Sequence, residues 1–155
     1  MTKTNMGRII LGGIVAGIVL DILGYLVDGI LLAPQWTAGM TALGKSGELT
    51  VNQIVSLNIL GLANGVFAIW LYAAIRPRYG AGPKAAVCAG LALWVAGVLL
   101  PNIGFMGVNG LFATNLTILT TAAGIVECVV AALAGAAVYK ESAAEPVRSS
   151  MAAGA

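Results

Sequence analysis

Four long apolar stretches alternate with short polar segments along the chain, and their lengths predict four membrane-crossing helices. A helix needs about 20 mainly apolar residues to cross a hydrocarbon core about 30 Å thick. The stretches that meet this length run over about residues 9–32, 52–75, 85–108 and 115–139. We therefore predict an all-α fold, an integral membrane four-helix bundle. It forms a single domain over residues 1–140 and is followed by a flexible cytoplasmic tail over 141–155.

The third stretch differs from the others because a proline interrupts its apolar run. Pro101 and Asn102 follow Leu100, and three glycines lie between residues 104 and 110. A proline inside a helix removes one hydrogen bond and collides with the preceding turn. The sequence therefore predicts a kink or a break at Pro101.

The segment between the first two stretches carries its own helical pattern. Trp36, Met40 and Leu43 are spaced so that they share one apolar helical face. One interpretation is a short interfacial helix in the first outer loop, with Trp36 as its anchor in the membrane surface. The other is a lid over a cavity. The pattern favours the interfacial helix.

The basic residues lie almost entirely on one side of this predicted topology. Seven of the eight precede the first stretch, lie between the second and third, or follow the fourth, and only Lys45 lies on the other side. Short loops rich in lysine and arginine stay in the cytoplasm. We therefore predict that both termini are cytoplasmic (N-in/C-in), in a bacterial inner membrane whose lipid bilayer is the first partner of the chain.

Composition excludes several classes of protein. Hydrophobic residues make up 59% of the chain and charged residues 9%, against roughly a quarter charged in soluble domains. Its 21 glycines favour closely packed membrane helices. Histidine is absent and the two cysteines form no C-x-x-C pair, which excludes the usual zinc sites and histidine-based catalysis. We expect no enzymatic activity, no cofactor, no metal and no nucleic-acid partner.

Acidic residues inside the spans are the main candidates for chemistry. Asp21 and Asp28 lie in the first span and Glu127 in the fourth, whereas no basic residue lies inside any span. A carboxylate in the membrane interior is costly unless it is paired, solvated or neutral. Without an ion-pair partner, these groups are expected to hold a proton or a cation.

Three polar residues are predicted to share one depth in the membrane. Asp21, Asn64 and Glu127 each lie 12 or 13 residues from the basic residue at the cytoplasmic end of their own helix. At about 1.5 Å per residue, this places them about 18 to 20 Å from that end. Gly97 of the third helix reaches the same level. We predict one polar layer near mid-membrane that faces a glycine.

Two further residues extend this candidate proton or cation site. Tyr25 and Asp28 follow Asp21 at helical spacing, so we expect Tyr25 to line the site. Asp28 lies closer to the outer interface, where water can solvate it. In an alternative interpretation, the acids bind no ligand. In that alternative they are neutral and hydrogen-bonded to each other, to Asn64 and to threonines, and they only join helices.

The chain resembles a group of short four-span bacterial membrane proteins of unassigned function. The likeness starts in the glycine-rich first helix leading into Trp36, Met40 and Gly44, and it continues in Leu71-Tyr72-Ala73-Ala74-Ile75-Arg76-Pro77. Pro101 and the glycine- and alanine-rich fourth helix complete it. The resemblance covers roughly Arg8 to Lys140 and implies no substrate, cofactor or catalytic residue.

Two functions remain open at this point. The first is an accessory or self-assembling membrane subunit with a buried protonatable carboxylate layer, which packs as a homo-oligomer or in a larger membrane complex. The second is a small proton- or cation-coupled transporter or channel that uses Asp21 and Glu127. A membrane enzyme ranks last.

Overall fold

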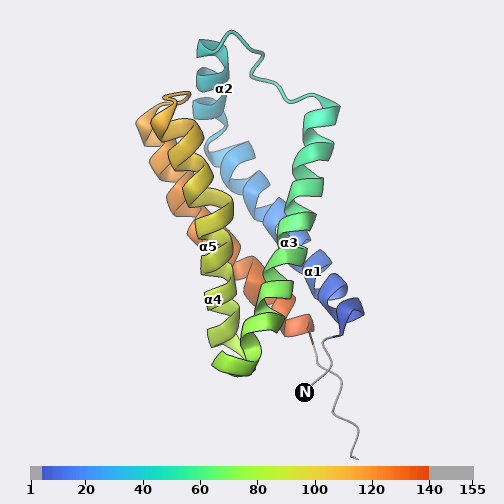
Figure 1. Ribbon diagram of the computed structural model, residues 1–155. Coiled ribbons are helices and arrows are strands. Elements are labelled where there is room, and N and C mark those ends of the chain that lie inside the picture. Colours follow the sequence, from blue (N-terminus) through green and yellow to red (C-terminus); the bar gives the residue numbers. More distant parts are fainter. Residues whose placement is uncertain (1–4, 140–155) are drawn as a thin grey trace, which may run out of the picture.

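Helices and the short connections between them make up residues 5–139, which the computed structural model describes (Figure 1). In chain order the helices are α1 (Met6–Gly24), η1 (Tyr25–Leu31), α2 (Ala33–Ala42), α3 (Val51–Tyr79), α4 (Pro83–Trp94), η2 (Val95–Leu99), η3 (Asn102–Val108) and α5 (Thr114–Val138), where η marks a π-helix. This part of the chain has no β-strand. The all-α prediction is confirmed. The tail predicted over 141–155 lies outside the described residues.

Four helical units are long and apolar enough to cross a membrane, as predicted. They are Met6–Leu31, Val51–Tyr79, Pro83–Val108 and Thr114–Val138. The second unit runs beyond its predicted end at residue 75, because the helix continues through Pro77. There the N–H of Gly80 donates to the carbonyl of Arg76 at 2.9 Å and closes the last turn.

The third span is not broken at Pro101. Its helix continues from Pro83 to Val108, with the π-helical segments η2 and η3 on either side of the proline. In a π turn the N–H of one residue reaches the carbonyl five residues back, as from Leu100 to Val95. The wider turn makes room for a proline ring, which in an α-helix collides with the carbonyl four residues earlier.

A helix does form between the first two spans. α2 follows η1 after Leu32 alone, and Pro34 lies in its first turn, where a missing N–H costs nothing. Pro34 therefore follows the end of the first span and also lies in the first turn of a new helix. That α2 lies in a membrane surface stays a prediction.

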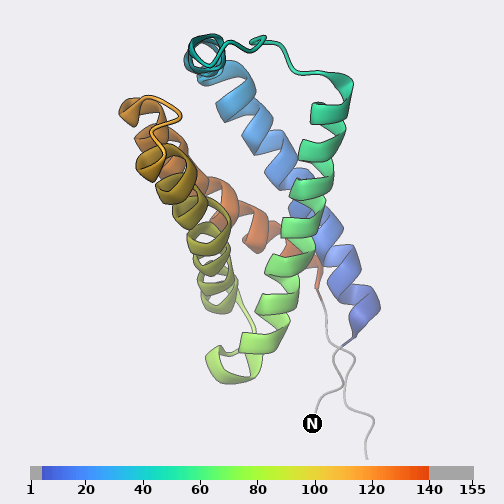
Figure 2. The same ribbon diagram turned by 45° about the horizontal axis from the view of Figure 1, so that its top comes forward.

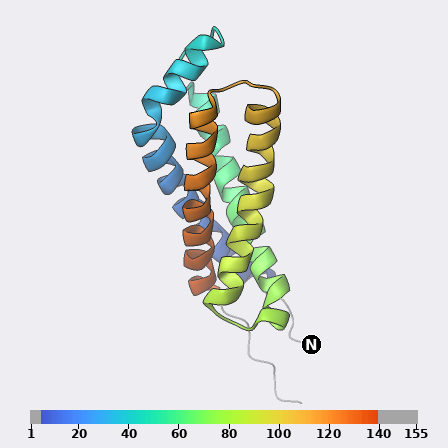
Figure 3. The same cartoon turned by 90° about the vertical axis from the view of Figure 1, so that its left-hand side faces the viewer.

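The spans alternate in direction, so α1 begins at the end of the bundle where α5 ends (Figure 1). α4 and α5 run antiparallel side by side (Figure 3). Arg8, Arg76, Arg78 and Lys84 all belong to this same end, and we call this half of the molecule the closed half. The other half, which holds α2 and the start of α3, is the open half. That the closed half faces the cytoplasm stays a prediction.

Small side chains bring the helices of the closed half into backbone contact. A Cβ on Gly13 of α1 would lie 2.5 Å from the Cα of Val66 in α3, and one on Gly65 would collide with the backbone of Gly13 and Gly17. On the other side of α1, a Cβ on Gly12 would lie 2.8 Å from the carbonyl oxygen of Gly135 in α5. Only glycine permits these approaches, as membrane helices commonly use it.

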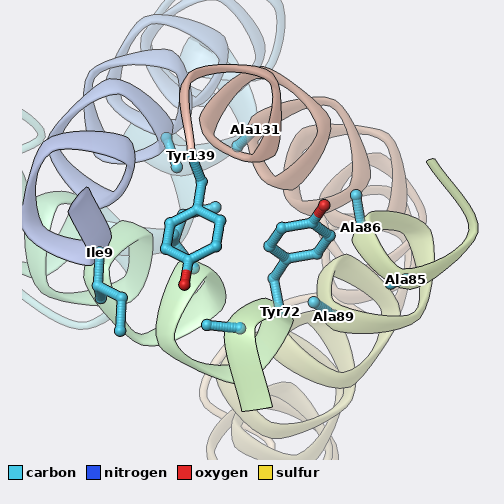
Figure 4. Packing of buried hydrophobic residues seen from close by; sticks show 10 residues of the cluster. Ile9, Tyr72, Ala85, Ala86, Ala89, Ala131 and Tyr139 are labelled. Carbon is cyan, nitrogen blue, oxygen red and sulfur yellow. The ribbon is translucent and has the colours of Figure 1, made fainter. Parts of the chain in front are cut away.

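A buried cluster from all four spans fills the closed half (Figure 4). The rings of Tyr72 and Tyr139 meet edge to face at 5.8 Å between centroids, and the Arg76 guanidinium lies 5.7 Å from the centre of the Tyr139 ring. The remaining members are Ile9, Ala16, Ile69, Ala73, Ala85, Ala86, Ala89 and Ala131.

In the open half, α3 leaves the other helices. Every residue from Val51 to Leu60 is exposed, and the start of α3 stands apart from the other spans in two views (Figures 1 and 2). The helix still begins cleanly, because Thr50 and Gln53 form a reciprocal capping box. The bundle is therefore tight at one end and splayed at the other.

Candidate functional site

A cleft of about 200 Å³ lies where the closed half gives way to the open half, and all four spans contribute to it. Four of its lining residues are those predicted to share one depth: Asp21, Asn64, Gly97 and Glu127. The other lining residues are mostly apolar: Leu20, Leu57, Leu60, Gly61, Leu93, Val98 and Cys128. The sequence therefore identified a set of side chains that the fold brings to one cavity.

A glycine on the facing helix makes room for the Asp21 side chain. Its carboxyl group lies against Gly61 of α3, so closely that a Cβ on Gly61 would overlap Oδ1. Gly17, one turn earlier on α1, approaches Leu62 in the same way. The crossing of α1 and α3 therefore leaves room for a carboxyl group and for little else.

Asn64 and Glu127 reach the cleft from α3 and α5. The Asn64 side-chain oxygen lies 3.9 Å from where a Cβ on Gly97 would stand. One turn before Glu127, Gly124 lets Val98 and Trp94 pack against α5, at 2.8 Å and 3.3 Å from its Cβ position. Asp21, Asn64 and Glu127 are each half-buried, as side chains at the wall of a cleft are.

The three polar side chains of the cleft do not bind one another. Within residues 5–139, no hydrogen bond or ion pair joins Asp21, Asn64 and Glu127. The alternative in which the acids serve to join helices requires such bonds. Their polar atoms are instead directed to a shared space, which leaves them available for a ligand.

A different set of polar groups joins the helices. Asn102 of η3 donates to the hydroxyl oxygens of Thr121 at 2.9 Å and of Thr120 at 3.3 Å, and the Trp94 indole donates to the Thr121 carbonyl at 2.8 Å. The sequence did not identify Asn102 and Trp94 as partners of these threonines. The signal was present in Asn102, a polar residue inside an apolar span.

Asp28 does not line the cleft. It is half-buried beneath α2, and its Oδ1 accepts a hydrogen bond from the Trp36 indole at 3.0 Å. The Trp36 ring meets Phe112 edge to face at 5.1 Å between centroids. Trp36, predicted as an interfacial anchor, thus also ties α2 to the end of the first span.

Tyr25 is also absent from the cleft, which differs from the expectation that it lines the site. Its side chain is 66% exposed and lies in a second hollow on the outside of α1 and α3. Asp21 lines this second hollow as well as the cleft. The Tyr25 N–H still donates to the Asp21 carbonyl, so Tyr25 keeps its α-helical spacing and follows Asp21 on the outside of the bundle.

The cleft supplies oxygen atoms from two carboxyl groups and one amide. In the described part of the chain, no three acidic, cysteine or histidine side chains gather closely enough to hold a metal ion. Two isolated carboxyl groups in apolar surroundings suit a proton or a singly charged cation.

Comparison with known proteins adds no relative. No family model, no curated protein and no solved structure matches this chain. The resemblance to short four-span bacterial membrane proteins stays a prediction. The four apolar helices and the cleft between them are therefore the features that bear on function.

Proposed function

We propose that this protein moves a small solute across the membrane in exchange for protons or another cation, with Asp21 and Glu127 as the exchanging groups. The observation that supports this most is the shared cleft, in which two carboxyl groups and the Asn64 amide face one space without bonding to one another. No basic side chain lines that cleft. Groups that only join helices would be expected to bond to each other.

The chemistry of the exchange follows from charge balance in an apolar cavity. A carboxyl group there is stable as the neutral acid, or as a carboxylate beside a bound cation. When a cation arrives, the acid releases its proton and the carboxylate holds the cation, so the net charge of the cleft is unchanged. Asn64 offers a donor and an acceptor that position a solute in either state.

The orientation is part of the proposal. Both termini lie in the cytoplasm of a bacterial cell, with the closed half inward and the open half outward, because the basic residues gather at the closed end. In this orientation, the splayed start of α3 lies on the outer side of the cleft.

Flux in liposomes tests the exchange. We expect Asp21→Asn and Glu127→Gln to abolish proton-coupled cation flux, because each amide keeps its shape but cannot release a proton. Glu48→Gln is the control, since Glu48 is an exposed acid between α2 and α3. If both cleft variants fold and transport as the unmodified protein does, the transport proposal is wrong.

A second function, an accessory or self-assembling subunit, is favoured by the exposed start of α3. Residues Val51–Leu60 are all exposed in the described part of the chain, and they include polar groups such as Asn52 and Ser56. A second copy or a larger complex would cover them. Cross-linking through Val55→Cys in vesicles tests this function, which predicts dimers from that position and none from the buried Cys128.

A further inference from the structure

A groove of about 340 Å³ runs along the outside of the bundle between α1 and α3. It is lined by Ile18, Asp21, Ile22, Tyr25, Leu26 and Asn58. Asp21 is the one lining residue that this groove shares with the central cleft. Its carboxyl group therefore stands in the wall between them, whereas Glu127 lines the cleft alone.

The position of Asp21 in this wall depends on the crossing of α1 and α3. Gly61 presents no side chain toward the carboxyl group, so nothing but Asp21 itself fills that point of the wall. On the outer side, the groove borders side chains that face lipid in a membrane: Ile18 is 47% exposed and Ile22 is 54% exposed.

The lining of the groove has two chemical characters. Three of its lining residues, Ile18, Ile22 and Leu26, are apolar, and the other three, Asp21, Tyr25 and Asn58, carry polar groups. Asn58 donates to the Ile54 carbonyl at 2.8 Å through its nitrogen, which leaves its side-chain oxygen as an acceptor. No basic residue lines the groove.

These features together suit one class of ligand. An acid and acceptor oxygens attract positive charge, while the apolar side chains gain dispersion contacts with a hydrophobic body. A small hydrated cation uses only the polar groups, and an uncharged lipid chain uses only the apolar side chains. A molecule with a cationic group on a hydrophobic body uses both.

We propose that this groove is a side-access site for amphiphilic cations, through which they reach Asp21 from the outer half of the bilayer. This inference depends on the proposed function and specifies its substrate class. On arrival, the cationic group takes the place of the proton on Asp21, and that proton leaves through the cleft. One positive charge thus replaces another, and no charge is left unbalanced in the apolar surroundings.

Binding of radiolabelled tetraphenylphosphonium to the full chain in phosphatidylcholine vesicles tests the site, with protein-free vesicles as background. Ile22→Trp fills the groove and leaves the lining of the central cleft unchanged. Leu11→Trp is the matched control, since Leu11 is 55% exposed on the same helix but lies outside the groove. We expect roughly tenfold weaker binding for Ile22→Trp and no change for Leu11→Trp.

Two competitors separate the two chemical characters of the ligand. Tetramethylammonium lacks the hydrophobic body, and triphenylphosphine lacks the charge. We expect neither to displace the bound probe at concentrations where unlabelled tetraphenylphosphonium does. Displacement by triphenylphosphine would show that the charge is irrelevant and would overturn the proposal.

Flux measured on the same variants separates this inference from the proposed function. If Asp21→Asn and Glu127→Gln abolish flux while Ile22→Trp changes neither flux nor binding, the exchange stands and the side-access site is wrong. If Ile22→Trp weakens binding in a protein without flux, the binding site stands and the transport proposal is wrong. Asn58→Leu, which removes an acceptor without adding bulk, replaces Ile22→Trp if the latter does not fold.

Discussion

The two halves of this bundle use the same helices in opposite ways. In the closed half, glycines and alanines bring backbones together, and the buried cluster draws on all four spans. In the open half, α3 passes ten residues, Val51–Leu60, without burying one of them. The difference follows side-chain size, since Val51–Leu60 contain neither glycine nor alanine.

The position of the acids relative to these halves is also informative. Asp21 and Glu127 lie where the helices begin to separate, so they are neither sealed in the closed half nor free in the open one. The contacts of the closed half hold the helices together. Under the proposed function, the carboxyl groups reach a ligand in the cleft at the junction of the two halves.

The largest predicted effect is the difference in stability loss between two substitutions, one in each half of α3. Ile69 is fully buried, with 0% exposure, and Ile59 is 62% exposed. We expect Ile69→Ala to lower the free energy of unfolding by about 2 to 5 kcal/mol, because it leaves a cavity. Ile59→Ala should leave that free energy nearly unchanged. Reversible unfolding in mixed detergent micelles measures both.

A large loss for Ile59→Ala would break the comparison between the halves. It would mean that the start of α3 is packed against something in the membrane. Repeating the measurement at lower protein concentration would then identify a second copy of the chain, because dissociation depends on concentration.

A smaller effect is predicted where the halves meet. Gly61→Ala places a methyl group on the Asp21 carboxyl, whereas at Gly97 the new methyl meets only ordinary contacts, the nearest at 3.6 Å. We expect Gly61→Ala to cost about 1 to 3 kcal/mol of unfolding free energy through crowding, and to reduce the flux that depends on Asp21. Gly97→Ala is the control and should change neither by a comparable amount.

The smallest effect is predicted in the open half. Trp36→Phe removes the hydrogen bond to Asp28 and keeps an aromatic ring beside Phe112. We expect a loss of about 1 kcal/mol, the usual net contribution of one hydrogen bond, measured by the same unfolding assay. Asp28→Asn retains an acceptor oxygen and should cost less. Equal losses for the two variants would assign the effect to Asp28 alone.

Much of this fold was predictable because the bilayer sets simple rules. Span number and approximate length follow from hydropathy, and the shared level of Asp21, Asn64 and Glu127 along the bundle follows from a constant rise per residue. The α-helical register held for those three residues, since each lies in an uninterrupted α-helix. Counting residues along each helix was therefore enough to predict that these three side chains lie at one level.

The remaining features could not be predicted from periodicity. Tyr25 follows Asp21 at helical spacing, but Asp21 borders two hollows, and periodicity does not say which of them Tyr25 lines. Pro101 was expected to disrupt a helix that widens instead. The groove beside Asp21 arises from the crossing of α1 and α3. That crossing depends on which glycines face each other, and a single helix pattern does not contain this information.

The π turns have a consequence for how the chain tolerates changes in length. A π turn holds one residue more than an α turn, so losing one residue between Tyr25 and Leu31 lets η1 return to α geometry. Side chains beyond the deletion then keep their faces, and Trp36 stays on the side of Asp28. The same deletion inside α5 would rotate everything beyond it by about 100°. The first and third spans can thus vary in length by one residue at their wide turns, while the fourth, which carries Glu127 in unbroken α geometry, cannot.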